Sequence, residues 1–312
     1  MSKVAVVQAP PVLLDRKGTI EGAVEQIAAV ASEGAELVVF PEAYLPGYPT
    51  WTWRLRPGGD AKLTSELHTR LIENAVDLRR GDLAPILEAA RDADVVVGIG
   101  LNEIDGDFAR STLYNTYVLI GPDGSLLNRH RKLMPTNPER MVWGMWDADG
   151  LRVVDTPVGR IGCLICWENF MPLARYALYA AGVEILLAPT WDSGSGWVGS
   201  MQHIAREGRC WVVSTATALH ASDIPDDFPS RDQVFPDPDE WINPGDAVVV
   251  RPGGELVAGP HHRERSVLFA DIDHKTVGPA RRNLDVAGHY ARNDVFQLTV
   301  NRGARPPVTW ED

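Results

Sequence analysis

Short runs of apolar residues recur along the chain, and each follows a segment whose apolar residues are spaced as on one face of a helix. Residues 20–31 have this spacing, and the apolar run 36–40 comes directly after them. The same order recurs at 83–99, 173–188 and 201–214. Strands that are buried on both faces and alternate with helices are typical of a sheet covered by helices. The pattern therefore predicts an α/β fold.

Other pairs of apolar runs are separated only by short turn sequences rich in glycine and proline. These pairs lie at 114–131, 151–165 and 247–257, and a single run follows at 267–271. Two strands joined by such a turn form an antiparallel hairpin. The predicted sheets are therefore mixed rather than purely parallel.

Three stretches do not fit this pattern and are expected to be additions to the scaffold. Residues 50–82 contain a helical run at 65–78, and residues 222–246 are acidic and rich in proline, which predicts an ordered surface loop. The tail 285–312 has little apolar content and is expected to be extended or docked on a partner subunit. Because none of these stretches resembles a linker, we expect one domain over residues 1–284.

Composition excludes several classes of partner. The net charge of −12 argues against nucleic acid and anionic membranes as binding partners. The hydrophobic fraction of 45% is ordinary for a globular protein and is enough for a sizeable core. The start of the chain lacks the features of a signal peptide, and no apolar run approaches the ~18 residues of a membrane span. A cytoplasmic protein is expected.

The three cysteines, Cys163, Cys166 and Cys210, are too few and odd in number for a disulfide framework. No Cys/His cluster supplies the remaining ligands of a metal site, so no metal is expected. Cys166 stands where the apolar run 161–165 stops and a helix is predicted to begin, with Pro172 in its first turn. A helix N-terminus can hold a thiol as thiolate. The alternative is that Cys166 is a small buried hydrophobe.

Two further reactive residues follow predicted strands. Glu42 comes after the run 36–40, and Lys132 comes after the hairpin strand that ends at Arg131. Functional groups collect beyond the carboxyl ends of strands in open α/β sheets. A carboxylate, an amine and the Cys166 thiol in such places would supply a base, an electrostatic stabiliser and a nucleophile. Taken singly, Glu42 would more often be a solvated loop acid, and the basic run 129–132 a solvated face.

Three segments of the chain resemble the signature blocks of the nitrilase superfamily of carbon–nitrogen hydrolases. They are residues 40–49, Phe-Pro-Glu-Ala-Tyr-Leu-Pro-Gly-Tyr-Pro; residues 130–136, His-Arg-Lys-Leu-Met-Pro-Thr; and residues 166–172, Cys-Trp-Glu-Asn-Phe-Met-Pro. The Cys-Trp-Glu-Asn order is similar to the nitrilase branch, and residues 285–296 resemble a C-terminal nitrilase motif. Asn293 stands where nitrilases commonly have proline, and the chain ends soon after this motif, which argues against long spiral assemblies.

The resemblance implies a four-layer αββα sandwich with mixed sheets. It implies that Glu42 is the general base, Lys132 the stabilising cation and Cys166 the nucleophile. Glu139 matches a second glutamate that supports the lysine and the attacking water. No metal or organic cofactor is implied, and the superfamily fold suggests a homodimer or larger homo-oligomer.

The expected reaction is hydrolysis of an organic nitrile to the carboxylic acid and ammonia through a thioimidate and a thioester on Cys166. Partial hydration to the amide, an amidase or N-carbamoyl hydrolase, and a catalytically silent binding module remain alternatives. A Cys-His hydrolase is a further rival, because His130, His203, His220 and His289 are present.

Aromatic residues near the three blocks give the expected substrate contacts, Tyr48, Trp167 and Trp191. Other tryptophans in or near these loops are Trp51, Trp53, Trp143 and Trp197, which suggests aromatic walls. An aromatic or arylaliphatic nitrile is therefore preferred over a small aliphatic one or cyanide.

Overall fold

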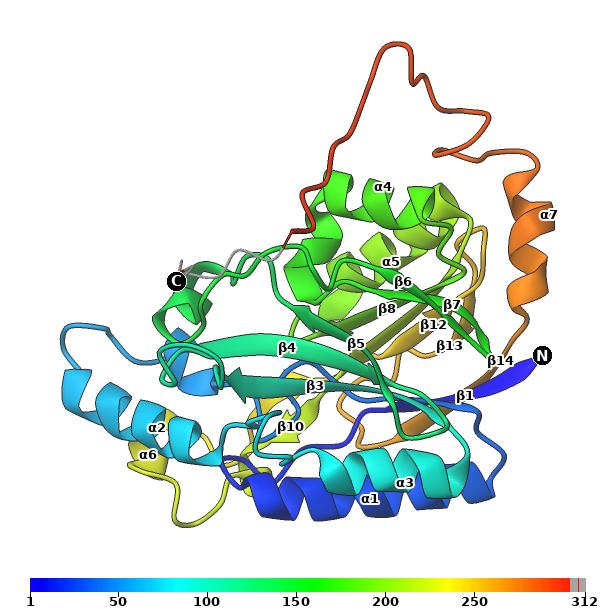
Figure 1. The fold of residues 1–312 in the computed structure, drawn as a ribbon. Helices are drawn as coiled ribbons and strands as arrows, with labels where there is room; N and C mark the ends of the chain where they lie inside the picture. The colour runs from blue at the N-terminus through cyan, green and yellow to red at the C-terminus, as the bar shows by residue number, and fades with distance from the viewer. Residues whose placement is uncertain (304–307, 309–312) are drawn as a thin grey trace.

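Two six-stranded sheets form the centre of the molecule, as Figure 1 shows. The computed structural model describes residues 1–303 and residue 308. The first sheet has the order β14-β1-β2-β3-β4-β5, in which β1-β2-β3 are parallel and the other pairs antiparallel. Its strands are β1 (Ser2–Val7), β2 (Leu37–Val39), β3 (Val96–Ile104), β4 (Leu113–Ile120), β5 (Leu126–Arg131) and β14 (Val267–Ile272).

The second sheet has the order β13-β12-β9-β8-β7-β6, and only β7-β8-β9 are parallel. A separate two-stranded sheet pairs β10 with β11. The strands are β6 (Val153–Thr156), β7 (Gly159–Cys163), β8 (Ile185–Thr190), β9 (Trp211–Ala216), β10 (Ala218–His220), β11 (Trp241–Pro244), β12 (Val248–Val250) and β13 (Leu256–Ala258). Both large sheets are mixed, as the sequence predicts.

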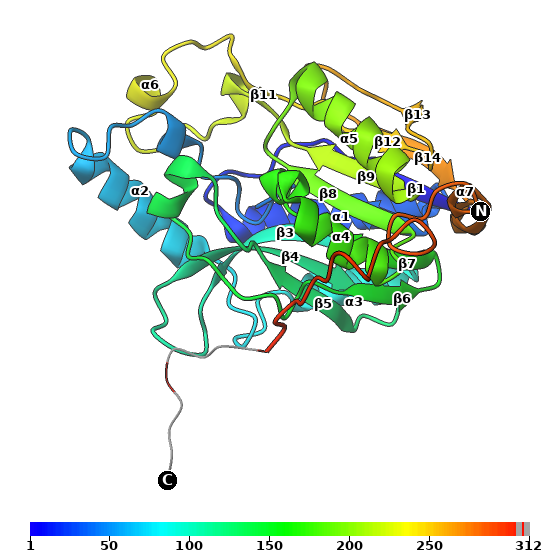
Figure 2. The ribbon, with the colours of Figure 1, turned by 90° about the horizontal axis from the view of Figure 1, so that it is seen from above.

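Helices cover the outer face of each large sheet. In Figures 1 and 2, α1 (Arg16–Ser32) and α3 (Ala84–Ala93) lie on the first sheet, and α4 (Pro172–Ala180) and α5 (Gly194–Gly208) lie on the second. The two sheets pack face to face around one apolar cluster that includes Val39, Ile161 and Val213. This is the expected four-layer αββα sandwich. The remaining helices are α2 (Ala61–Asn74), α6 (Arg231–Val234), α7 (Val277–Arg281), η1 (Thr50–Trp53), η2 (Asn137–Met141), η3 (Cys166–Phe170), η4 (Ala221–Asp223) and η5 (His274–Thr276).

Element boundaries differ from the sequence prediction where capping or packing extends a helix. Helix α1 begins four residues before position 20, because the Asp15 carboxylate caps it by accepting from the Gly18 N–H at 3.0 Å. The segment 222–246, which was predicted to be an ordered surface loop, also contains the short elements α6 and β11. The Arg54 guanidinium donates to both carboxylate oxygens of Glu240 at 2.6 and 3.0 Å, and this ion pair joins the segment to η1.

The tail runs from α7 past α4, as Figure 1 shows, and is described up to residue 303 and at residue 308. Val286, Ala287 and Val300 pack against the apolar cluster of the α4–α5 layer of their own chain. Docking of the tail on a partner subunit stays a prediction, as do the single domain over 1–284 and the homo-oligomer. Part of the predicted tail, residues 304–307 and 309–312, lies outside the described residues. Within residues 1–303, no helix has both the length and the apolar character that a membrane span requires.

Gly100 of β3 allows the strand to pass directly beneath the segment 41–43. A Cβ at position 100 would lie 2.3 Å from the Pro41 carbonyl oxygen and 2.5 Å from the Ala43 nitrogen. The Leu45 N–H donates to the Gly100 carbonyl at 3.0 Å, which fixes the same segment from its other end. The position of Glu42 is therefore set by a close backbone contact that only glycine permits.

We expect Gly100→Ala to lower the free energy of unfolding by about 2–3 kcal/mol, because the methyl group would overlap backbone atoms that cannot rotate away. Urea unfolding at 25 °C measures the change. Gly22→Ala is the matched control: a Cβ there has no atom within 4 Å, and alanine in the α1 interior should raise stability by up to about 1 kcal/mol. Equal stability of Gly100→Ala and the unaltered chain would contradict the steric argument.

Candidate active site

The residues that follow β2, β5 and β7 meet between the two sheets. Glu42, Lys132 and Cys166 are almost completely buried, with exposed fractions of 1%, 1% and 4%. Lys132 continues the β5 pairing, because its N–H donates to the Asn115 carbonyl of β4 at 2.8 Å. Leu164, after β7, donates its N–H to the Leu187 carbonyl of β8 at 3.1 Å. Regular pairing thus carries both segments into the site.

Lys132 binds two carboxylates at once. Its Nζ donates to Oε1 of Glu42 at 2.7 Å and to Oε2 of Glu139 at 2.8 Å. Burial alone would lower the pKa of Lys132, but the charges of Glu42 and Glu139 and the hydrogen bond to Glu139 outweigh it and raise the pKa above its ordinary value. The amine therefore stays an ammonium ion.

Glu42 has one oxygen engaged and one free among the described residues. Its Oε1 accepts from Lys132 and from the Asn115 side-chain amide, each at 2.7 Å, while its buried Oε2 has no hydrogen-bond partner there. Burial raises the pKa of Glu42 despite the opposing charge of Lys132, and the charge of Glu139 adds to the rise. A carboxylate of this kind is a stronger base than usual and has an oxygen available for a proton.

Glu139 is held from three directions. It sits in η2, where the Thr136 N–H donates to its Oε2 at 2.6 Å in a capping box. The Tyr48 hydroxyl donates to Oε1 at 2.7 Å and accepts from Trp53 Nε1 at 2.9 Å. Tyr48, expected only as a substrate contact, therefore also fixes Glu139.

Cys166 opens η3 in the left-handed region, with φ +52°. Such a conformation costs about 1–3 kcal/mol in a residue other than glycine. The Asn169 side chain stabilises this turn by donating to the carbonyls of Leu164 and Cys166 at 2.8 and 2.9 Å. The strained turn projects the sulfur toward Thr190, whose hydroxyl lies 3.2 Å away and donates to it.

The sequence indicates a helix N-terminus at Cys166, where a thiol can be held as thiolate, but burial and the nearby acids act against the charged form. Burial raises the pKa of the Cys166 thiol well above its ordinary range, and the charge of Glu42 adds to this effect. Lys132 opposes the rise without cancelling it, and the helix that begins at Cys166 is a single five-residue 3₁₀ turn. The sulfur is therefore a neutral thiol that must lose its proton as it attacks.

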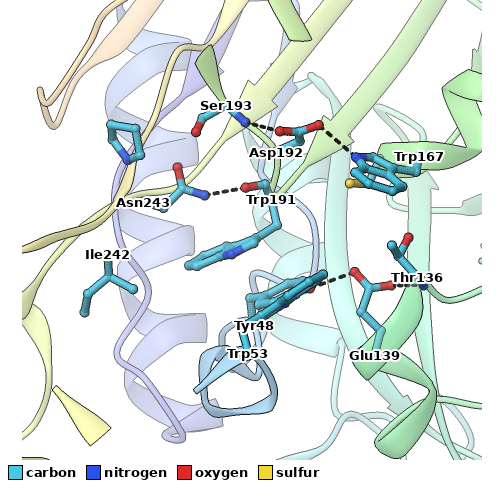
Figure 3. Close-up of a pocket in the computed structure, with 12 residues that line it drawn as sticks. Tyr48, Trp53, Thr136, Glu139, Trp167, Trp191, Asp192, Ser193, Ile242 and Asn243 are labelled. Atoms are coloured by element: carbon cyan, nitrogen blue, oxygen red, sulfur yellow. Dashed lines mark hydrogen bonds between the residues drawn. The ribbon is translucent and has the colours of Figure 1, made fainter. Parts of the chain in front are cut away.

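A pocket with a volume of about 260 Å³ reaches Cys166 and Glu139. Figure 3 shows the rings of Tyr48, Trp53 and Trp191 together on one side and Trp167 with Asp192 on another. The rings of Tyr48 and Trp191 stack at 4.4 Å and 5°. The remaining lining residues are Thr136, Ser193, Ile242, Asn243 and Pro244.

All three residues expected to contact substrate, Tyr48, Trp167 and Trp191, line this pocket, although their role stays a prediction. Trp197 does not, since it lies on α5 and its Nε1 donates to the Ser214 hydroxyl at 2.8 Å in the core. Trp143 packs behind Tyr48, edge to face at 5.4 Å.

The described contacts do not support a Cys-His pair. His130 is buried and its Nε2 lies 2.9 Å from the Glu168 carboxylate, so it faces an acid rather than the thiol. His203 pairs with Glu207, and His220 bonds to Ser222. Among residues 1–303 no group of three or more His, Cys, Asp or Glu side chains is arranged to hold a metal ion.

Sequence reasoning missed Asn115 and Thr190, which bond to the Glu42 carboxylate and the Cys166 sulfur. Both lie within buried strands, where a polar side chain needs a partner. A polar residue inside an apolar run could therefore have indicated that each side chain has a buried partner. The identity of that partner could not be predicted, because it lies far away in the sequence.

Comparisons with known proteins agree with this geometry. Residues 3–282 match the family described as carbon–nitrogen hydrolase. An aliphatic nitrilase of Sinorhizobium fredii (strain HH103) is 39% identical over 98% of this chain and 97% of its own, and nitrilase 2 of Arabidopsis thaliana is 39% identical over 99% and 91%. The crystal structure of a carbon–nitrogen hydrolase from Helicobacter pylori G27 has a TM-score of 0.71 at 22% identity, over 94% of this chain and 96% of that one. The chain therefore belongs to the carbon–nitrogen hydrolase family.

Proposed function

We propose that this carbon–nitrogen hydrolase is a nitrilase that converts an organic nitrile and two waters to the carboxylic acid and ammonia. The observation that carries the proposal is the Lys132 ammonium bound by Glu42 and Glu139 behind a pocket that reaches the Cys166 thiol. Relatives named nitrilases, 39% identical over nearly the whole chain, support a nitrile rather than an amide as substrate.

The first half of the reaction forms the covalent intermediate. The Cys166 sulfur attacks the nitrile carbon while its proton passes to the free Oε2 of Glu42, the stronger base described above. The nitrile nitrogen receives this proton as the carbon–nitrogen triple bond becomes a double bond. The product of this half is a thioimidate on Cys166.

The second half uses two water molecules. The first adds to the thioimidate carbon with Glu42 as base, the carbon–nitrogen bond breaks, and ammonia leaves a thioester on Cys166. The second water breaks the carbon–sulfur bond, which releases the carboxylic acid and restores the thiol. Lys132 stabilises the negative charge that develops at each tetrahedral stage, with the Trp167 N–H proposed as a second donor; one such donor is worth about 3–4 kcal/mol.

The size and lining of the pocket support a nitrile with a single aromatic ring. Its volume of about 260 Å³ is below the ~300–1,000 Å³ typical of pockets for drug-sized ligands. The pocket wall has apolar surface from Tyr48, Trp53, Trp191 and Ile242. The Asp192 carboxylate adds a negative charge to the lining. An aromatic or arylaliphatic nitrile is therefore proposed over cyanide or a short aliphatic nitrile.

Other outcomes remain as alternatives to this proposal. Expulsion of sulfur before ammonia would release the amide, and an amidase or N-carbamoyl hydrolase would use the same residues. A catalytically silent binding module would not need the buried arrangement of Glu42, Lys132 and Cys166. A cytoplasmic location stays a prediction from the sequence.

We expect Cys166→Ala to reduce ammonia release from nitriles by roughly 10⁴-fold or more, because no other group can form the thioimidate. Mass spectrometry after brief exposure of the unaltered enzyme should find the substrate adduct on Cys166. Cys210→Ala is the matched control, since Cys210 is equally buried but bonds to none of the site residues. Ammonia release that persists in Cys166→Ala would exclude the nitrilase mechanism, and the amide-to-acid ratio of the products separates nitrilase from hydratase.

Trp191→Ala should raise KM for phenylacetonitrile by about 10-fold, because it removes the ring that stacks on Tyr48 and walls the pocket. KM for propionitrile should change by less than about threefold, since a short alkyl group fills little of the widened space. Steady-state ammonia release with both nitriles gives the comparison. Equal changes for the two substrates would contradict the aromatic preference.

A further inference from the structure

A further buried acid, Glu168, lies two residues after the nucleophile and has no part in the reaction described above. Its side chain is completely buried, and its carboxylate is bound by donors from two separate segments of the chain. It accepts the Ile165 N–H at 2.6 Å and the Leu133 N–H at 2.7 Å. His130 Nε2 lies 2.9 and 3.1 Å from its two oxygens. These partners lie in or next to the segments that carry Lys132 and Cys166.

The two backbone N–H groups that donate to Glu168 belong to residues adjacent to the proposed catalytic residues. Ile165 directly precedes Cys166, and Leu133 directly follows Lys132. One rigid carboxylate therefore joins the backbone next to the nucleophile to the backbone next to the ammonium. We propose that Glu168, held by His130, is a positioning residue that sets the placement of Cys166 relative to Lys132 and Glu42.

The pair with His130 lets the carboxylate stay charged where water is absent. Burial opposes the charged form of Glu168, but His130 and the N–H groups of Leu133 and Ile165 lower its pKa below the ordinary value. Burial likewise opposes the charged form of His130, and the charge of Glu168 raises the pKa of His130 overall. An anionic acceptor binds an N–H group about twice as strongly as a neutral one.

Simple capping of η3 does not account for these contacts. A cap requires only the bond to the Ile165 N–H, which lies within the same turn. The bonds to Leu133 and His130 leave the turn and reach the end of β5, 35 and 38 positions away in the sequence. Because a misplacement of about 1 Å between reacting groups can cost 10²-fold in rate, such a cross-link serves the chemistry as well as the fold.

Glu168→Gln tests the proposal, because glutamine keeps the size of the side chain but offers one acceptor oxygen to the two N–H groups. We expect the rate of Cys166 alkylation by iodoacetamide to fall by about 10–100-fold, and kcat for nitrile hydrolysis to fall by a similar factor with KM changed less than threefold. Near-UV circular dichroism and the melting temperature report the folded fraction, to which both rates are normalised.

Glu103→Gln is the matched control. Like Glu168, Glu103 is buried, and its carboxylate pairs with a basic residue of β5, Arg131, at 2.6 Å. Its other described hydrogen bonds go to Arg129 and Thr116, and none goes to the backbone beside Cys166. It should lower the melting temperature comparably and leave the alkylation rate within about threefold of the unaltered enzyme. Alkylation slowed equally in both variants, or unchanged in folded Glu168→Gln, would overturn the proposal.

Glu168→Asp carries the test if Glu168→Gln does not fold. Aspartate keeps the charge beside His130 but is one methylene too short to hold the N–H groups of both Leu133 and Ile165. Its alkylation rate should fall about 10-fold, and a rate equal to that of the unaltered enzyme would overturn the proposal. The inference rests on Cys166 as the proposed nucleophile, and alkylation needs no nitrile turnover. Failure of the nitrilase proposal would therefore appear only in ammonia release, and failure of the positioning role in alkylation.

Discussion

The buried ion pairs of Lys132 are the interaction on which this molecule depends. One ammonium ion binds two carboxylates, Glu42 and Glu139, in an interior where an unpaired charged group is costly. Breaking a buried pair by removing one partner typically costs about 3–5 kcal/mol, so the site and the stability of the fold are coupled. The contacts of Asn115, Thr136 and Tyr48 all serve to complete this cluster.

The same constraint explains how a thiol with a raised pKa can act as the nucleophile. An isolated thiolate beside Glu42 and Glu139 would add a third negative charge to the site, so the sulfur keeps its proton until attack begins. Glu42 combines a raised pKa with an oxygen that no described residue occupies, and it can therefore take that proton as the carbon–sulfur bond forms. The charge of the site is then constant through the first step, which avoids the cost of ionising sulfur in a dry cavity.

Much of the fold was readable from the sequence, because apolar runs of strand length and helical spacing are local properties. The strand β2 and the helix start at Pro172 agree with their predicted positions to within a few residues. The site was predictable mainly through resemblance. From charge alone, the run 129–132 indicates a solvated face, yet His130, Arg131 and Lys132 are all buried.

Each of these three consecutive bases pairs with an acid from elsewhere in the chain: His130 with Glu168, Arg131 with Glu103, and Lys132 with Glu42 and Glu139. No local pattern reveals partners that lie up to 90 positions apart. The protonation state of Cys166 could not be predicted either, because burial and the nearby acids decide it, and neither is visible before the sheets are packed together.

The pH dependence of Cys166 alkylation tests most directly whether Glu42, held by Lys132, is the base for a neutral thiol. Iodoacetamide labelling would be followed by mass spectrometry from pH 4 to pH 10 in the unaltered enzyme and in Glu42→Gln. The account predicts one rise in rate at a pH above 4.5, the ordinary pKa of the acid, and a level rate through the region near pH 8.5 where a free thiol ionises. It also predicts a loss of about 10²-fold in Glu42→Gln. A rate that climbs tenfold per pH unit up to pH 8.5, and is the same in both proteins, would contradict it.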